Sequence, residues 1–417
     1  MGRWRIASRV DHPDLAEANA LALADLDGGA DTLVLVSAGA PTAYGFGVSL
    51  AEPGAVETVL AGVSLDLIGV RLDLGRDGTA IVDRLMAHIG HVGYPPATLD
   101  LGLDPVSCLA HDGILPGDWP AVAHDLPRRI GELDTRGFVG PKLRADGRTW
   151  HAAGATDAQE LAAVVAAAVL YLRALEAGGI GLHQARSSVS FGLVADRDLV
   201  ATLAKVRALP RLWSSVEVAC GLEPRAIHVH ADTAWRSMTA VSSHTNIVRS
   251  AAATAAAALA GADGVTVLPH TQPLGLPDAD ARRIARNTQH VLAEESQLWR
   301  VADPAAGADV VEAATRGLCD KAWAEVQTIE REGGLVTSLI DGRIQQRVEA
   351  ERQARHDRLV GGEEILVGVT RYADEADTTP VVLPVESRAV LPPGDRLADP
   401  MPMARSSATF EATRASR

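Results

Sequence analysis

Several side chains that can bind a ligand or take part in catalysis follow short apolar runs in this sequence. His228 and His230 stand two residues apart and Asp232 continues the spacing, so on a strand the three side chains share one face. Imidazole and carboxylate groups bind divalent metals, and this pattern is compatible with a metal-dependent hydrolase. Two histidines hydrogen-bonded inside a polar cavity are the alternative. Because no further ligand at a recognisable spacing accompanies them, we predict no metal site. Other candidates are Asp104, His151, His270 and Gln272.

These side chains need a scaffold, and the sequence indicates one. Short apolar runs alternate about eight times with longer Ala- and Leu-rich stretches, and runs that are apolar throughout are typical of parallel strands covered on both faces. The count favours an α/β fold, a (β/α)8 barrel, in which sites lie at the carboxyl ends of the strands. An open doubly wound sheet usually has a glycine-rich phosphate turn after its first strand, which this sequence lacks. The predicted strands are 32–37, 65–74, 98–104, 148–152, 187–194, 226–231, 264–269 and 299–302.

Composition divides the chain into four parts. Residues 1–27 form an N-terminal segment, and residues 28–308 hold the predicted barrel. Residues 309–371 read as a helical extension, because two long charged helical stretches follow one another there. From residue 372 to 417, prolines accumulate among Asp, Glu, Thr and Ser. This last part is predicted to be an extended and largely unpacked tail or linker.

Composition and charge also exclude several classes of protein. Hydrophobic residues make up 47% of the chain, so a large core is available and wholesale disorder is excluded. The formal net charge is -14, which argues against nucleic-acid binding because a phosphate backbone needs a basic surface. The three cysteines are widely spaced and fit a reducing compartment. The apolar stretches are shorter than the ~20 residues of a membrane span, so we predict a cytoplasmic protein without membrane contact.

A series of segments is more informative than composition or periodicity, since the segments follow the order found in one known family. They are HAAGATDAQEL at 151–161, NIVR at 246–249, LGLP at 274–277, ARRIARNTQ at 281–289 and VADP at 301–304. Together with shorter matches they cover roughly residues 4–372, which makes chance similarity a poor explanation. In these segments the chain resembles the coenzyme B12-dependent methylmalonyl-CoA mutase family.

This resemblance implies a chemistry and a set of site residues. In the family, the barrel holds an acyl-CoA along its axis, and adenosylcobalamin sits against the mouth on a separate domain. The reaction is a radical rearrangement of the carbon skeleton, for which the cofactor supplies the radical and the barrel positions the substrate. By motif, His151 matches the family's histidine at the thioester carbonyl, and His230 matches a second histidine of the mouth.

The same comparison reveals departures at every ligand group. Asp104 follows Gly102 and Leu103, where the family carries a Gln before its Asn-Asp pair. Asp232 replaces a Gln, and Leu268 and Gln272 replace the Asn and Glu that hold the adenosyl ribose. The arginine that pairs with the substrate carboxylate is absent, and no Asp-x-His-x-x-Gly cobalamin motif occurs. Asp104, Asp232 and Gln272 are therefore predicted to be remnants of substrate- or cofactor-facing positions.

In these losses the chain resembles the small, non-catalytic subunit of heterodimeric mutases. We therefore expect a structural subunit that pairs with a homologous catalytic chain, with adenosylcobalamin and acyl-CoA present in the complex but adenosylcobalamin not bound by this chain alone. Two alternatives stay open. One is a catalytic acyl-CoA mutase barrel whose cobalamin domain is a separate polypeptide, which the retained His151 and His230 favour. The other is the metal-dependent barrel hydrolase suggested by His228, His230 and Asp232.

Overall fold

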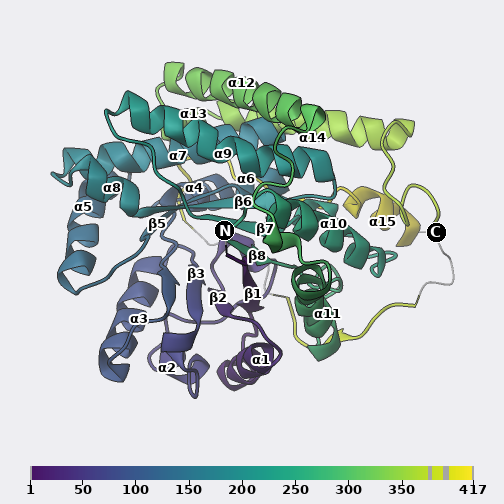
Figure 1. Cartoon of the computed structure of the whole chain (residues 1–417), viewed down its shortest axis with the longest axis horizontal. Coiled ribbons are helices and arrows are strands. Elements are labelled where there is room, and N and C mark those ends of the chain that lie inside the picture. Colours follow the sequence, from purple (N-terminus) through teal and green to yellow (C-terminus); the bar gives the residue numbers. More distant parts are fainter. Residues whose placement is uncertain (1, 374–377, 388–393, 416–417) are drawn as a thin grey trace.

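Eight parallel strands form a closed barrel in the computed structural model, which describes residues 2–373, 378–387 and 394–415 (Figure 1). The sheet order is β4-β3-β2-β1-β8-β7-β6-β5. Just after β4 the backbone of Leu103 closes the ring: its amide donates to Lys142 O (3.0 Å) and its carbonyl accepts from Arg144 N (3.0 Å). The fold is therefore the predicted (β/α)8 barrel. Its strands are β1 (Arg5–Val10), β2 (Thr32–Val36), β3 (Gly69–Asp73), β4 (Thr98–Asp100), β5 (Leu143–Asp146), β6 (Val189–Ala195), β7 (Val229–Thr233) and β8 (Gly264–Thr266).

Helices surround the barrel, and several begin at a capping side chain. Thr156 forms a capping box with Gln159 at the start of α7, and the Asp278 carboxylate caps α11 by accepting from Ala281 N (2.9 Å). The barrel helices are α1 (Leu15–Asp27), α2 (Ala55–Val59), α3 (Gly78–Val92), α4 (Pro105–Asp112), α5 (Trp119–Thr135), α6 (Arg148–Ala153), α7 (Asp157–Ala177), α8 (Leu182–Ser187), α9 (Leu199–Ala219), α10 (Thr245–Leu259) and α11 (Ala279–His290).

Two of the eight strands lie where the sequence did not predict them. β1 lies inside the expected N-terminal segment and pairs with both β2 and β8, so the barrel begins at residue 5 and not at residue 28. β5 precedes the expected strand at 148–152, which is instead helix α6. The expected strand at 299–302 is absent, since a short 3-10 helix occupies Leu298–Arg300. β1 contains the buried Arg9, which pairs with Asp11, and β5 contains the buried Arg144, which pairs with Asp73 and Asp100, so neither strand has the sequence of an apolar run.

The C-terminal part adds three helices along one edge of the molecule (Figure 1). They are α12 (Asp309–Arg331), α13 (Leu335–Ile340) and α14 (Arg343–Gly361). Helix α12 packs on α7 and α9, and the buried Val326 and Ile329 belong to the main core. The predicted helical character after residue 308 is therefore present in the structure.

The described parts of the C-terminal tail are packed, contrary to the expectation of an unpacked linker. β10 (Val382–Leu383) pairs with β9 (Leu276–Pro277), and α15 (Ala408–Ala415) ends the described chain. Ala398 and Met401 are buried. The proline-rich composition correctly indicates little regular structure, but backbone amides and small apolar side chains still anchor the segment to the barrel.

Helix α7 is long and apolar enough to cross a membrane by length and composition alone. However, 72% of its apolar window is buried inside the protein, between the barrel and α12. It is therefore a core helix in this fold.

Candidate functional site

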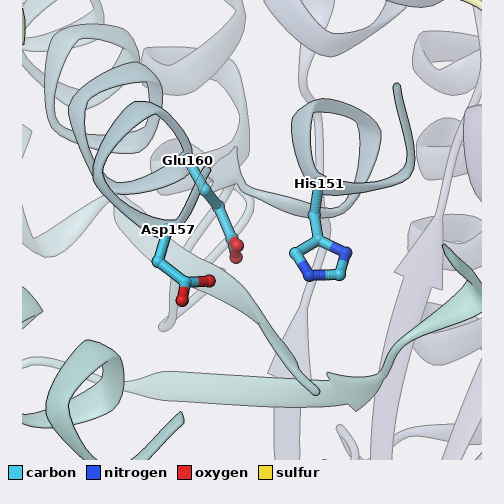
Figure 2. Close-up of side chains that lie close together, drawn as sticks. All are labelled: His151, Asp157 and Glu160. Carbon is cyan, nitrogen blue, oxygen red and sulfur yellow. The ribbon is translucent and has the colours of Figure 1, made fainter. Parts of the chain in front are cut away.

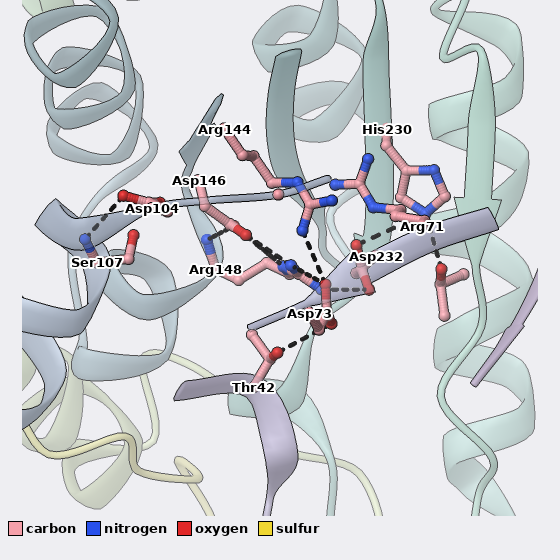
Figure 3. A network of polar contacts seen from close by, with 12 residues as sticks. Thr42, Arg71, Asp73, Asp104, Ser107, Arg144, Asp146, Arg148, His230 and Asp232 are labelled. Carbon is pink, nitrogen blue, oxygen red and sulfur yellow. Dashed lines mark hydrogen bonds and ion pairs between the residues drawn. The ribbon is translucent and has the colours of Figure 1, made fainter. Parts of the chain in front are cut away.

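A network of ion pairs crosses the interior of the barrel at the height of the strand ends (Figure 3). Arg148, from the first turn of α6, binds Asp73 at the end of β3 (2.7 Å) and Asp232 in β7 (3.1 Å). It also binds Asp146 at the end of β5 (2.6 Å). In the closed ring β3 and β7 each lie two strands from β5 and four strands from each other, so a single guanidinium bridges opposite walls of the barrel.

Two further arginines, which lie on the strands themselves, extend this network. Arg144 in β5 donates to Asp73 (2.9 Å) and pairs with Asp100 (2.9 Å). Arg71 in β3 binds Asp100 as well (2.5 Å). All of these side chains are buried. We refer to Arg71, Asp73, Asp100, Arg144, Asp146, Arg148 and Asp232 as the axial network.

The charges of the axial network nearly balance, with three arginines facing four aspartates. Burial acts to raise the pKa of Asp73, but Arg148, Arg144 and Arg71 outweigh it, so its pKa lies well below the usual value. Burial raises the pKa of Asp232, which Arg148 only partly offsets. Asp232 is thus the one aspartate of the four whose pKa is shifted toward the neutral form.

Little free space is left around this network. The cavity bounded by Asp73, Arg144, Asp146 and Arg148 has a volume of about 20 Å³. A single water needs ~10–15 Å³ measured in this way, so the interior has room for one or two waters. An acyl-CoA arm does not fit along this axis unless the arginines move.

His230 lies inside the barrel but does not face an open site. Its Nε2 is 2.7 Å from Thr266 Oγ1 on the neighbouring strand β8, and 3.8 Å from an Asp232 carboxylate oxygen. Burial, with Arg71, His228 and Arg148 nearby, lowers the pKa of His230 well below the ordinary value, so the ring is neutral. The histidine is therefore a hydrogen-bonded member of the barrel wall.

The metal-hydrolase arrangement does not form. His228 lies before β7, about half exposed, and its Nδ1 is 3.6 Å from Asp263. His230 is buried and bonded to Thr266, as described above. Among the described residues, the group close enough to hold a metal is a different one, His151 with Asp157 and Glu160.

That second group surrounds His151, which the sequence singled out as a catalytic candidate (Figure 2). His151 belongs to α6 and is fully buried, and its ring faces Asp157 and Glu160 at the start of α7. Its Nε2 lies 3.2 Å from Asp196, but neither ring nitrogen makes a well-oriented hydrogen bond to a described residue. Burial, with Arg236 and Lys205 nearby, lowers the pKa of His151 to about 3.

A lysine, and not a metal, satisfies the two carboxylates of this group. The Lys205 ammonium from α9 lies 2.8 Å from Asp157 and 2.6 Å from Glu160. Burial raises the pKa of Glu160 to about 7, although Lys205 opposes the shift. A divalent cation would have to displace Lys205 from a fully buried position. The group is therefore a structural ion pair between α7 and α9.

The remaining predicted residues also have structural partners or are enclosed. Asp104 caps α4 by accepting from Ser107 N (2.9 Å), and it accepts a second hydrogen bond from the Tyr171 hydroxyl (2.5 Å). Burial, together with Asp146, raises its pKa to about 6. Gln272, in the turn after β8, is buried, and its side-chain amide makes no hydrogen bond within the described chain.

The arginines that dominate the site were not among the residues predicted from the sequence. The prediction selected Asp104, His151, His230, Asp232 and Gln272 because they follow apolar runs, and the structure places only His230 and Asp232 next to one another. A signal for the rest was present. Charged residues interrupt otherwise apolar strands at Arg71 and Arg144 and end them at Asp73 and Asp146.

The mouth of the barrel, at the carboxyl ends of the strands, is crossed by the chain's own C-terminal tail. Residues 394–407 pass over the segments that follow β4, β5 and β7. Earlier in the tail, β10 covers the segment after β8. The backbone hydrogen bonds that hold the crossing run from Leu397 to Gly113 (2.7 Å), Met401 to Ala110 (2.8 Å), Ala404 to Ala152 (2.9 Å) and Ser406 to Arg236 (2.9 Å).

Fold and interior together define a (β/α)8 barrel protein whose axis is closed by ion pairs. The sequence model of the methylmalonyl-CoA mutase family matches residues 136–393, more than half of the chain. The "Methylmalonyl-CoA mutase small subunit" of Streptomyces virginiae is 38% identical over 379 residues, 89% of this chain and 59% of that protein. The chain therefore belongs to the methylmalonyl-CoA mutase family.

Two further relatives come from one organism, Propionibacterium freudenreichii subsp. shermanii. Its "Methylmalonyl-CoA mutase small subunit" is 34% identical over 333 residues, 77% of this chain and 50% of that protein. Its "Methylmalonyl-CoA mutase large subunit" is 34% identical over 246 residues, 57% of this chain and 33% of that protein. The chain thus spans about half to six tenths of the length of these small subunits.

Proposed function

We propose that this chain is a structural, non-catalytic subunit of a methylmalonyl-CoA mutase-like assembly and that a homologous catalytic chain carries out the reaction. The observation that supports this most strongly is the axial network. A barrel that holds an acyl-CoA needs an open axis, whereas here Arg148 bridges three aspartates across it and leaves about 20 Å³.

The environment of His151 supports the same proposal. A group that binds a substrate carbonyl or transfers a proton must reach the reacting atoms. His151 is fully buried, faces Asp157 and Glu160 and lies beside Asp196. Burial lowers the pKa of His151 to about 3, so the ring is uncharged near neutral pH. It is a packing residue between α6 and α7 in this proposal.

The described residues do not fit adenosylcobalamin, the cofactor that the family resemblance implies. A large planar cofactor would need the mouth of the barrel, and residues 394–407 cross it. Leu268 and Gln272, at the positions of the family's ribose contacts, are both buried. We therefore place adenosylcobalamin and acyl-CoA on the catalytic chain of the assembly.

The partner is proposed to be a homologous catalytic chain in the same compartment. The names of the two Propionibacterium relatives, a small and a large subunit, support a two-subunit assembly. The three free cysteines fit the cytoplasm, where thiols stay reduced. An obligate interface of this kind buries ~2,000 Å² or more.

Reconstitution tests the proposal. The chain is mixed with a homologous catalytic mutase chain, and complex formation is measured by size-exclusion chromatography with light scattering. We expect a heterodimer, and we expect the catalytic chain without this partner to be less stable. In a parallel titration of this chain alone, the visible spectrum of adenosylcobalamin should not change. Saturable micromolar binding by this chain alone would favour the catalytic alternative, a mutase barrel that uses a separate cobalamin-binding subunit.

A further inference from the structure

A second cavity lies outside the barrel, between helix α14, the end of α6 and the C-terminal tail. Its volume is about 330 Å³. Four arginines line it, Arg236, Arg352, Arg355 and Arg405, but only one carboxylate, Glu349. This excess of positive charge is local, because the chain as a whole carries a formal net charge of -14.

Three of these arginines are neutralised by a nearby carboxylate, and the fourth is not. Arg236 pairs with Asp196 (3.0 Å), Arg405 pairs with Glu411 (2.7 Å), and Arg352 pairs with Glu349. Arg355 donates to the backbone carbonyl of Gly154 (3.0 Å), and no described carboxylate lies within ion-pair distance of it. Burial, with Arg236 nearby, lowers the pKa of Arg355 to about 10. The cavity therefore holds one guanidinium without an anionic partner.

The rest of the wall is apolar and comes from two separate parts of the chain. Leu359 of α14 and Ala152 of α6 form one side, and Ala404 and Ala408 of the tail form the other. Backbone hydrogen bonds from Ala404 to Ala152 and from Ser406 to Arg236 hold the two sides together. Ligand sites typically measure ~300–1,000 Å³, so this one suits a small molecule and not a large cofactor.

We propose that this cavity binds a small organic anion that carries a phosphate group. The phosphate lies against Arg355, with Arg352 and Arg405 beside it, and the organic part lies against Leu359 and the alanines. A guanidinium matches phosphate oxygens with two parallel hydrogen bonds, and such charge-assisted bonds are about twice as strong as neutral ones. Because tail residues form one wall, a bound ligand also fastens the tail to the barrel.

Isothermal titration calorimetry of the 417-residue chain tests this proposal with three probes. They are ADP, inorganic phosphate, and adenosine, which has no phosphate. We expect ADP to bind at one saturable site, inorganic phosphate to compete with it more weakly, and adenosine to bind at least ~10-fold more weakly than ADP. The comparison separates recognition of the phosphate from recognition of the organic part.

Two variants and one control locate the site. Arg355→Gln should weaken ADP binding by about tenfold or more, because a charge-assisted contact is lost. Gln353→Glu adds a negative charge to the same wall without removing the bond to Gly154, so it should also weaken binding. Arg343→Gln lies on the same helix but pairs with Asp341 on the surface (2.9 Å), and it should bind ADP as the unmodified chain does.

The thermal unfolding midpoint of each variant is measured first, and Gln353→Glu carries the test if Arg355→Gln does not fold. Three results would overturn the proposal. They are no saturable binding of ADP or phosphate at millimolar concentrations, binding of adenosine as tight as that of ADP, and ADP binding that is unchanged in the folded site variants.

Discussion

Replacing Arg148 by methionine tests the axial network directly. Methionine keeps the unbranched apolar stem of the side chain but lacks the guanidinium and its charge, so Asp73, Asp146 and Asp232 lose the group that binds all three. Removing one partner of a buried ion pair lowers the free energy of unfolding by about 3–5 kcal/mol. Because three carboxylates share Arg148, we expect a loss near the upper end, about 5 kcal/mol of unfolding free energy.

The pH dependence of this loss is also predicted. In the unmodified chain the arginines hold the pKa of Asp73 well below its usual value, so its contribution to stability is complete above about pH 4. In Arg148→Met, Asp146 and Asp232 lose the guanidinium that pairs with them, whereas Asp73 keeps Arg144, so burial should raise the pKa values of Asp146 and Asp232 above their unfolded values. The stability of the variant then decreases as pH rises, so the loss should be larger at about pH 8 than at about pH 5.

Guanidinium chloride unfolding followed by tryptophan fluorescence measures this effect, since Trp150 and Trp213 are buried. The matched control is Arg343→Met, whose exposed pair with Asp341 should contribute less than about 1 kcal/mol. The double variant Arg148→Met with Asp146→Asn should lose less than the sum of the two single variants, because the second change removes a carboxylate that the first leaves without its guanidinium. A loss below about 1 kcal/mol in Arg148→Met, equal to that of the control, would refute the reasoning.

Three further predictions follow from other parts of the structure. Lys205→Met leaves the fully buried Glu160 and the partly buried Asp157 without a counter-charge, so chemical unfolding should show a loss of about 3–5 kcal/mol. An unchanged midpoint would contradict the ion-pair assignment. Met401 is buried in the tail, so Met401→Ala should lower the free energy of unfolding by roughly 2–5 kcal/mol and increase hydrogen exchange at the mouth of the barrel. Met403 is only partly buried, so Met403→Ala should lower it by less. Equal effects would mean that the tail is not docked. Acid unfolding followed by circular dichroism should begin below about pH 4, because the pKa values of Asp73 and Asp196 lie well below their usual value, so their stabilisation is lost as pH falls. Unfolding that begins near neutral pH would argue against the axial network and against the ion pair of Asp196 with Arg236.

The sequence predicted the barrel because apolar strands such as Thr32–Val36 are buried on both faces and read as continuous runs. It failed at Arg5–Val10 and Leu143–Asp146 for one physical reason. Periodicity assigns charged residues to solvent, whereas Arg9 and Arg144 in these strands are buried and pair with aspartates. Their partners are distant in sequence, as Arg148 and Asp232 are, 84 residues apart. Only the folded barrel brings them together.

The candidate site was predicted only in part, again because its contacts join residues that are distant in sequence. Residue type and position at strand ends correctly indicated His230 and Asp232 as neighbours inside the barrel. They could not show that His230 bonds to Thr266 or that Lys205 from α9 satisfies the carboxylates around His151. For the tail the prediction was wrong because it expected an unpacked segment. Its composition indicates little regular structure, but backbone hydrogen bonds such as that from Met401 to Ala110 do not depend on composition.

The claim that this chain is structural and its partner catalytic is tested most directly by the turnover of methylmalonyl-CoA in the reconstituted complex with His151→Ala in this chain. Complex formation and the unfolding midpoint of the variant are checked beforehand. If His151 is a packing residue, turnover should stay within about twofold of the unmodified complex, because no reacting group is lost. A loss of ~10²-fold or more, the scale of a removed acid–base or electrostatic group, would show that this barrel takes part in the reaction.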